Sequence, residues 1–177
     1  TSVLPEETRW GYFPAASLGW LISSEEFMKS LSPITHLKLR VSWGQNGTTA
    51  SLGSYSYATT INSGGSYPFT NELIYSTGSS PSATGNNELK WETSEQTNIG
   101  IDARFLNDRL TASLDYFHKE TKDLIMMGIT ASTIVGNTAS PVNAGNVLNK
   151  GFEFELGWKD KIGDFTYNVR GNMASLK

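Results

Sequence analysis

The sequence contains no cysteine among its 177 residues. Without thiols the chain can form neither a disulfide framework nor a thiolate metal site. It also lacks any run of about 18 apolar residues, which excludes a transmembrane helix. Charged residues make up only 18% of the chain and the net charge is −3, so nothing draws it to nucleic acid or anionic lipid.

Glycine, aromatic residues and small polar residues are abundant instead. There are 17 glycines and 11% aromatic residues, together with many Ser, Thr and Asn, a composition typical of strands and turns. The mean hydropathy of −0.31 suits a membrane barrel, because its strands alternate lipid-facing and lumen-facing residues. No signal-peptide pattern opens the sequence and the last alternation stops in mid-pattern at Lys177, so we expect both ends to be cuts in a longer protein.

Six segments alternate apolar and polar residues with a period of two, the pattern of a β-strand with one apolar and one polar face. In the second segment Leu37, Leu39, Val41 and Trp43 oppose the residues between them. The six segments are residues 12–20, 37–44, 96–105, 110–117, 152–158 and 165–170. We therefore expect an all-β fold with six antiparallel strands.

The connections between these strands alternate between short and long. A tight turn at Asn107-Asp108 and residues 159–164 are short, whereas residues 45–92 and 119–149 are long. Residues 24–27, within a medium connection, are expected to form a short capped helix. Tight turns at one rim and long loops at the other are typical of an up-and-down outer-membrane barrel.

The two faces of the strands differ in chemistry. Aromatic residues end the apolar faces, where they would form interfacial girdles in a membrane or cap the core of a sandwich: Trp20, Trp43, Phe105, Tyr116 and Trp158. Residues that need water or ion pairing occupy the polar faces, and we expect them to face a lumen: Lys38, Arg40, Asn98, Asp102, Arg104, Asp115, Glu153, Glu155 and Arg170. The period alone does not separate a lumen from the solvated face of a soluble sheet.

Five segments carry a resemblance to a known family. Two of them are NELKWETSEQTNIGID, residues 87–102, and RLTASLDYFHKETKDLI, residues 109–125. The other three are residues 11–20, 37–44 and 143–153. In this order the five segments resemble the SusC/RagA-type TonB-dependent transporters of the outer membrane. The resemblance implies an antiparallel up-and-down transmembrane β-barrel in the outer membrane of a Gram-negative bacterium. This chain would supply about six of the roughly 22 strands.

The resemblance also implies how the complete protein works. Residues 1–177 would belong to the barrel domain, without the plug domain and without the closing strands. The complete transporter would import oligosaccharides or peptides with energy delivered through TonB, which contacts the missing N-terminal part. A SusD-like surface lipoprotein would close over the barrel, outer-membrane lipid would surround it, and no cofactor is implied.

The long loop between the second and third strands carries the residues that we expect to contact substrate. Aromatic faces stack on the C–H surface of sugars, while neighbouring amides and hydroxyls bond the sugar hydroxyls, and loops commonly carry binding residues. The candidates are Tyr55, Tyr57, Tyr67, Phe69 and Tyr75. The alternative is that these rings pack the loop against itself or against the lipoprotein.

No constellation of residues supports catalysis, and we expect the chain not to be an enzyme. Glu153 and Glu155 share a strand face about 7 Å apart by strand geometry, a spacing that could suit glycoside hydrolysis. Two carboxylates on a polar face are far more often simply solvated. His36 and His118 are the only histidines and lie far apart in sequence, so a metal site is not expected.

Two other readings remain open: a secreted β-sandwich that binds carbohydrate or acts as an adhesin, and a glycosidase domain. A sandwich needs turn signals at similar intervals on both of its ends. The decisive observation concerns the row that contains Leu39, Ile101, Leu114 and Phe154. A second sheet or a helix over this row would overturn the transporter assignment.

Overall fold

The computed structural model describes residues 3–29, 33–68, 75–128 and 136–177. The chain divides into two compact units. The first, here the loop unit, consists of Thr1–Tyr12, Gly47–Thr93 and Lys122–Asn146; the second, here the sheet unit, consists of Phe13–Asn46, Ser94–Thr121 and Val147–Lys177. In the described part of the chain, no helix is long and apolar enough to cross a membrane.

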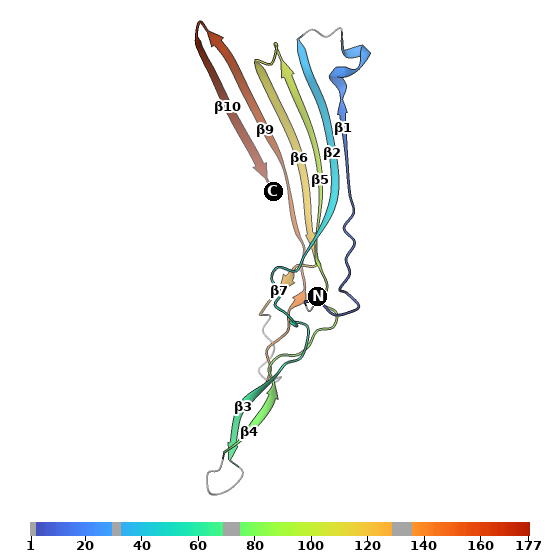
Figure 1. Cartoon of the computed structure of the whole chain (residues 1–177), viewed down its shortest axis with the longest axis vertical. Coiled ribbons are helices and arrows are strands. Elements are labelled where there is room, and N and C mark those ends of the chain that lie inside the picture. The colour runs from blue at the N-terminus through green and yellow to red at the C-terminus, as the bar shows by residue number, and fades with distance from the viewer. Residues whose placement is uncertain (1–2, 30–32, 69–74, 129–135) are drawn as a thin grey trace. The chain divides into compact units, whose positions relative to one another are not determined.

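The sheet unit is built on one six-stranded sheet with the strand order β1-β2-β5-β6-β9-β10 (Figure 1). Its strands are β1 Ala15–Leu21, β2 Ile34–Thr48, β5 Glu92–Phe105, β6 Leu110–Lys122, β9 Val147–Ile162 and β10 Phe165–Leu176. All six predicted strands are confirmed, and each pairs with the next of the six along the chain. The result is the expected up-and-down meander.

Most of these strands are longer than the sequence alternation indicated. β2, β5, β6, β9 and β10 have 15, 14, 13, 16 and 12 residues, more than the 9–11 or so that a tilted strand needs to cross a membrane. The extensions follow hydrogen bonding rather than hydrophobic pattern. Lys119 of β6, for example, still pairs with Asn149 of β9.

The N-terminal edge of the sheet differs from the prediction in two ways. β1 begins at Ala15 rather than Tyr12, directly after Pro14, whose carbonyl accepts a hydrogen bond from Gln45 N at 2.9 Å. The expected capped helix is instead two single-turn 3-10 helices, η1 Ile22–Ser24 and η2 Glu26–Met28, and neither has a side-chain cap.

The β1–β2, β5–β6 and β9–β10 connections all lie at the same end of the strands, as expected for the rim with the tight turns (Figure 1). In the β5–β6 turn Leu106, Asn107 and Asp108 have φ values of 55°, 58° and 65°. Asn and Asp tolerate this left-handed conformation better than most residues, which explains their place in the turn. Gly163, with φ 62°, serves the β9–β10 turn.

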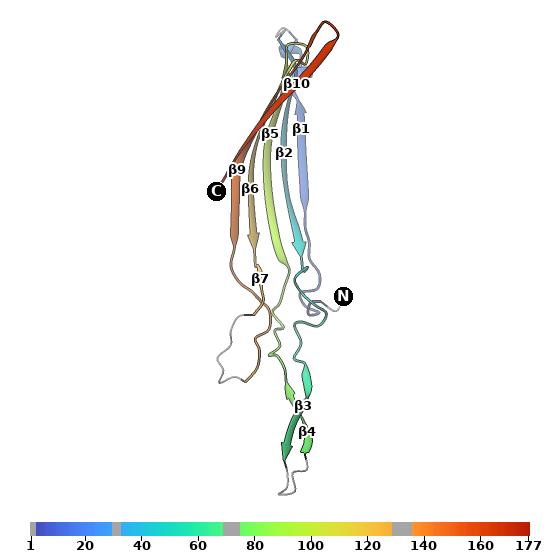
Figure 2. The ribbon, with the colours of Figure 1, turned by 90° about the vertical axis from the view of Figure 1, so that its left-hand side faces the viewer.

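The apolar face of the sheet is uncovered by any second layer among the described residues. Figure 2 shows a single layer of strands, bowed along their length. Leu114 lies opposite Phe154, which lies opposite Met173, and these side chains are 46%, 38% and 70% exposed. Ile101 is 42% exposed. In the part of the chain that the structure describes, no second sheet or helix lies over this row, so the observation that would overturn the transporter assignment is not made there.

Aromatic side chains mark two levels on this face. Trp158 lies toward the short turns, and Phe152 lies six residues away on the same strand, about 20 Å at 3.4 Å per residue. The ring of Phe152 packs on that of Tyr116, with centroids 4.9 Å apart. Because barrel strands are tilted by about 35–45°, this separation spans about 15 Å across the membrane and fits within an apolar band about 25 Å tall.

The loop unit contains short strands that the sequence did not reveal. β3 Ile61–Pro68 and β4 Tyr75–Pro81 form an antiparallel hairpin with an irregularity between Ser63 and Gly65. β7 Ile125–Met126 pairs with β8 Val142–Asn143. The small core of the loop unit is centred on Leu4 and Leu89, which are 1% and 0% exposed.

Candidate functional site

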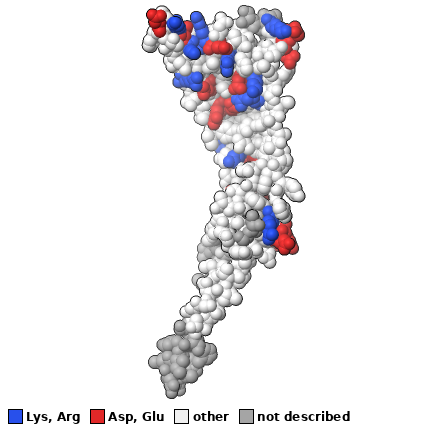
Figure 3. Space-filling view, in the orientation of Figure 1, with Lys and Arg blue, Asp and Glu red and all other residues white. Residues whose placement is uncertain are grey.

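The polar face of the sheet collects all nine predicted polar residues. Figure 3 shows acidic and basic side chains intermixed over the six-stranded sheet on the face in view. We call the following residues the charged zone: Lys38, Arg40, Asp102, Arg104, Asp115, Glu153, Glu155 and Arg170. Asn98, the ninth residue, lies on β5 nearer to the end of the sheet where the long loops begin.

Arg40 is the centre of the charged zone. Its Nε donates to Asp102 Oδ2 at 2.6 Å and its Nη2 to Asp102 Oδ1 at 3.0 Å. The same Nη2 donates to Asp115 Oδ1 at 3.0 Å. Ser113 Oγ donates to Asp102 Oδ1 at 3.3 Å and Asp115 Oδ2 at 3.1 Å. One guanidinium therefore links three adjacent strands, β2, β5 and β6.

Gly100 makes this arrangement possible. It is buried on β5 beneath the ion pairs. A Cβ at this position would overlap Asp115 Oδ1 and would lie 2.8 Å from Arg40 Nη2. A side chain at this position would have to displace the Arg40 guanidinium or the Asp115 carboxylate from the arrangement seen here.

The rest of the charged zone has the features of a solvated surface rather than an active site. Glu155 lies opposite Asn172 of β10 in the strand pairing, and its Oε1 is 4.0 Å from Arg170 Nη1. An exposed pair of this kind contributes about 0–1 kcal/mol to stability. Among the described residues, no group of three or more His, Asp or Glu is placed to hold a metal ion.

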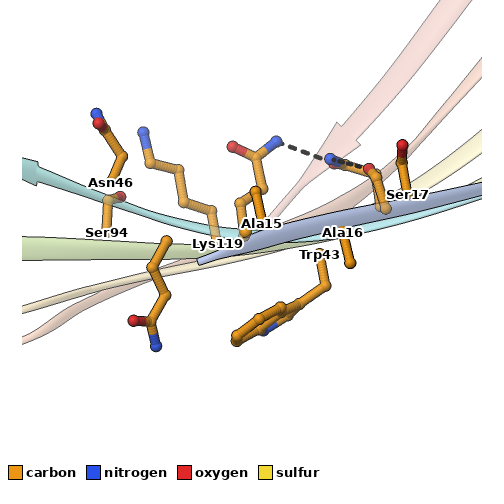
Figure 4. Close-up of a pocket in the computed structure, with 12 residues that line it drawn as sticks. Ala15, Ala16, Ser17, Trp43, Asn46, Ser94 and Lys119 are labelled. Carbon is orange, nitrogen blue, oxygen red and sulfur yellow. Dashed lines mark hydrogen bonds between the residues drawn. The ribbon is translucent and has the colours of Figure 1, made fainter. Parts of the chain in front are cut away.

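A second site, here the neutral groove, lies on the sheet near the ends of the strands that lead into the long loops. It has a volume of about 470 Å³ and is bordered by strands β1, β2, β5 and β6. Figure 4 shows Ser17, Asn46, Ser94 and Lys119 on one side of the ribbon, with Trp43 projecting from the other. Gln96 Nε2 donates to Asn98 Oδ1 at 2.9 Å, and Asn98 Nδ2 donates to Ser42 Oγ at 3.2 Å.

The loop aromatic residues are only partly brought together. The rings of Tyr55 and Tyr57 have centroids 6.4 Å apart and planes inclined by 44°, and Tyr55 is 57% exposed. Tyr67 and Tyr75 belong to the β3–β4 hairpin, where Tyr67 pairs with Ser76 and Pro68 with Tyr75. Phe69 lies outside the described residues. A substrate role for all five remains a prediction.

The Asn143 side chain forms hydrogen bonds within the loop unit. Its Oδ1 accepts from Lys90 N at 2.9 Å, and its Nδ2 donates to both Lys90 O and Asp123 O at 2.9 Å. The Lys90 ammonium also lies 3.0 Å from Asp123 Oδ2. One amide thus ties together two segments that flank the sheet strands in sequence.

Asn143→Asp should therefore loosen the loop unit. A carboxylate cannot donate to either carbonyl, so two acceptors lose their partner, at about 1–3 kcal/mol for each group left unsatisfied and buried, and less where water enters. We expect faster amide hydrogen exchange at residues 86–92 and 123–126. Asn62→Asp, in the same unit, is the matched control, because the Asn62 side chain is exposed and bonds none of the described residues. Equal exchange in the two variants would contradict the assigned role.

Gly100, Ser113 and Lys119 are among the residues of these sites that were not predicted. Gly100 and Ser113 take part through the pairing of strands β2, β5 and β6, which periodicity does not provide. Lys119 was within reach, because it is two residues beyond Phe117 on the same face of β6. The predicted alternation ends at residue 117, whereas the strand continues to Lys122.

Comparison with known proteins identifies relatives along nearly the whole chain. The model of the family "TonB dependent receptor-like, beta-barrel" matches residues 2–176. The chain is 35% identical to the TonB-dependent receptor SusC of Bacteroides thetaiotaomicron, over 97% of the chain and 18% of SusC. It is 37% identical to the TonB-dependent receptor P39 of Formosa agariphila, over 96% of the chain and 16% of P39. The chain spans less than a fifth of the length of these relatives.

Solved structures agree on the fold. The structure of the RagAB peptide importer in the closed-closed state superposes with a TM-score of 0.76 at 23% identity, covering 99% of this chain and 19% of that one. The open-open state gives a TM-score of 0.77 at the same identity and coverage. At this identity the likeness concerns the fold alone.

Proposed function

Because the chain belongs to the TonB-dependent receptor β-barrel family of Gram-negative outer-membrane proteins, we propose that it forms part of the wall of a nutrient transporter. The observation that carries this proposal is the asymmetry of its sheet. One face exposes large apolar side chains with no covering layer among the described residues, and the other bears an ion-paired charged zone. Hydrocarbon outside and an aqueous lumen inside satisfy both faces at once.

The two edge strands of the sheet are consistent with its being part of a larger barrel. β1 and β10 are the terminal strands of the six, so one side of each carries backbone groups that no strand of this sheet pairs. Unpaired backbone groups are costly in lipid, and closed barrels avoid them. The complete protein supplies the remaining strands, together with the plug that transporters of this kind hold in the lumen.

The cargo that we propose is an oligosaccharide, imported with TonB energy and captured with the help of a SusD-like lipoprotein. The neutral groove offers hydroxyls and amides, which match sugar hydroxyls. Tyr55 offers an exposed ring that can stack on a sugar. The five loop aromatic residues and the nine polar residues of the sheet are the contacts proposed for substrate and lumen.

Uptake by cells that express the complete protein tests this function. Labelled neutral and acidic oligosaccharides and a mixture of peptides would be offered to cells with and without functional TonB. We expect oligosaccharide uptake that is lost without TonB. Tyr55→Ala together with Tyr57→Ala should lower uptake while surface expression stays unchanged.

Three results would argue against the proposal. Uptake of peptides alone would remove the cargo assignment but keep the transporter. Uptake that persists without TonB, or hydrolysis of the oligosaccharide by the purified protein, would remove the transport mechanism itself. The charge-neutral pair Tyr55→Phe and Tyr57→Phe keeps the stacking faces and serves as the control.

A further inference from the structure

The neutral groove is lined by uncharged residues and by a single charged one. None of the side chains that line it is a carboxylate, and Lys119 is the only one of them that is charged. This contrasts with the charged zone on the same sheet, where acidic and basic groups occur together. The groove therefore combines hydrogen-bonding groups without charge and one ammonium.

Lys119 is not neutralised within the described chain. It is exposed, and the described residues give it neither a hydrogen bond nor an ion pair. The acidic residue nearest to it on its own strand face is Asp115, four residues away or about 13 Å along the strand. Asp115 already accepts two contacts from Arg40. The ammonium is thus left available to an external anion.

The neighbouring amides are held in a defined orientation. The relay from Gln96 through Asn98 to Ser42 uses one Gln96 N–H and one Asn98 N–H, so the Gln96 carbonyl oxygen and the Ser42 hydroxyl proton remain for a ligand. Ser94 Oγ and Thr121 Oγ1 are 3.1 Å apart on the adjacent strands β5 and β6. Donors and acceptors therefore lie beside the unpaired ammonium of Lys119.

We propose that the neutral groove binds an acidic oligosaccharide, with a carboxylate or sulfate on Lys119 and sugar hydroxyls on the Gln96–Asn98–Ser42 relay. The inference rests on the proposed import function and specifies its cargo. A volume of about 470 Å³ lies within the 300–1,000 Å³ or so that is usual for small-ligand sites. An acidic group gains a charge-assisted hydrogen bond to the Lys119 ammonium that a neutral sugar cannot form, so the site should prefer acidic sugars.

Binding calorimetry on the complete transporter in detergent tests the inference. The probes are hexagalacturonate and its methyl-esterified form, and a sulfated galactan hexasaccharide and its desulfated form. Each pair has the same length and differs in charge. We expect at least one acidic member to bind about tenfold more tightly than its neutral counterpart, as a charge-assisted hydrogen bond provides.

Three variants separate Lys119 from general charge effects. Lys119→Gln should remove the preference for the acidic member, and Lys119→Arg should keep it. Lys150→Gln is the matched control, because Lys150 follows Asn149, the pairing partner of Lys119, and projects from the opposite face of the sheet. It removes the same charge from the same level and should leave the preference intact. Heat-dependent gel migration verifies that each variant is folded.

The outcomes distinguish this inference from the proposed function. Equal binding of acidic and neutral members, binding of neutral members alone, or a preference that survives Lys119→Gln would overturn the acidic-cargo site. The same holds if none of the four probes binds while cells still import neutral oligosaccharides through TonB, and import then stands. If cells import no oligosaccharide at all, both proposals fail.

Discussion

Met173→Arg will lower the free energy of unfolding of the membrane-inserted barrel by about 2–4 kcal/mol, the cost of arginine on a lipid face near the bilayer midplane. Met173 lies opposite Phe154, which lies opposite Leu114, so all three share the apolar row. Their level falls between the aromatic residues Trp158 and Phe152. An arginine at this position has hydrocarbon on every side that the strand does not occupy.

The adjacent residue provides the control. Asn172 lies opposite Glu155 on the polar face and at the same level of the strand. Asn172→Arg adds the same side chain beside a carboxylate and water, so we expect a change smaller than about 1 kcal/mol. Urea titration in lipid vesicles, followed by tryptophan fluorescence and by gel migration, measures both variants.

The comparison also separates the two readings of the sheet. In a soluble sandwich the apolar row would be a protein core, and the folded protein would be monodisperse without detergent. Equal destabilisation by the two variants would contradict a lipid-facing row, because depth-dependent cost on one face only is the mark of a bilayer. Insensitivity of both variants would contradict it as well.

The strands of the sheet could be predicted from the sequence because each has one apolar and one polar face. A period of two then survives in the residues themselves, as in Leu110 to Phe117. The β3–β4 hairpin could not be predicted in the same way. Its residues, such as Gly64, Gly65 and Ser66, show no apolar alternation, and backbone hydrogen bonds alone define the strands.

The candidate site shows the same division. The sequence pattern placed Arg40, Asp102 and Asp115 on polar faces, and in the structure their side chains meet. It could not show that one guanidinium holds both carboxylates, because Arg40 and Asp102 are 62 residues apart in sequence and depend on strand register. The requirement for Gly100 follows from the same register. The predicted start of the first strand was wrong because pairing with β2 begins at Ala15. The predicted capped helix was wrong because the extended backbone of Glu25 separates two 3-10 turns.

Arg40→Ala is expected to destabilise the barrel by about 2 kcal/mol, between the cost of losing an exposed ion pair and that of breaking a buried one. The intermediate value follows from exposure: the side chains of Arg40, Asp102 and Asp115 are 40%, 34% and 28% exposed. Without the guanidinium, two carboxylates on adjacent strands repel each other. Arg104→Ala is the control, because Arg104 is on the same face and its side chain has no ion pair among the described residues.

A second substitution shows whether repulsion is the cause. Adding Asp115→Asn to Arg40→Ala removes one of the two facing negative charges, so it should restore about half of the lost stability, whereas Asp115→Asn alone should destabilise. Gly100→Ala should resemble Arg40→Ala, since its methyl group occupies the space that the guanidinium and Asp115 share. If Arg40→Ala and Arg104→Ala unfold at the same urea concentration, the three-strand link carries no stability and the charged zone is simply a solvated lumen wall.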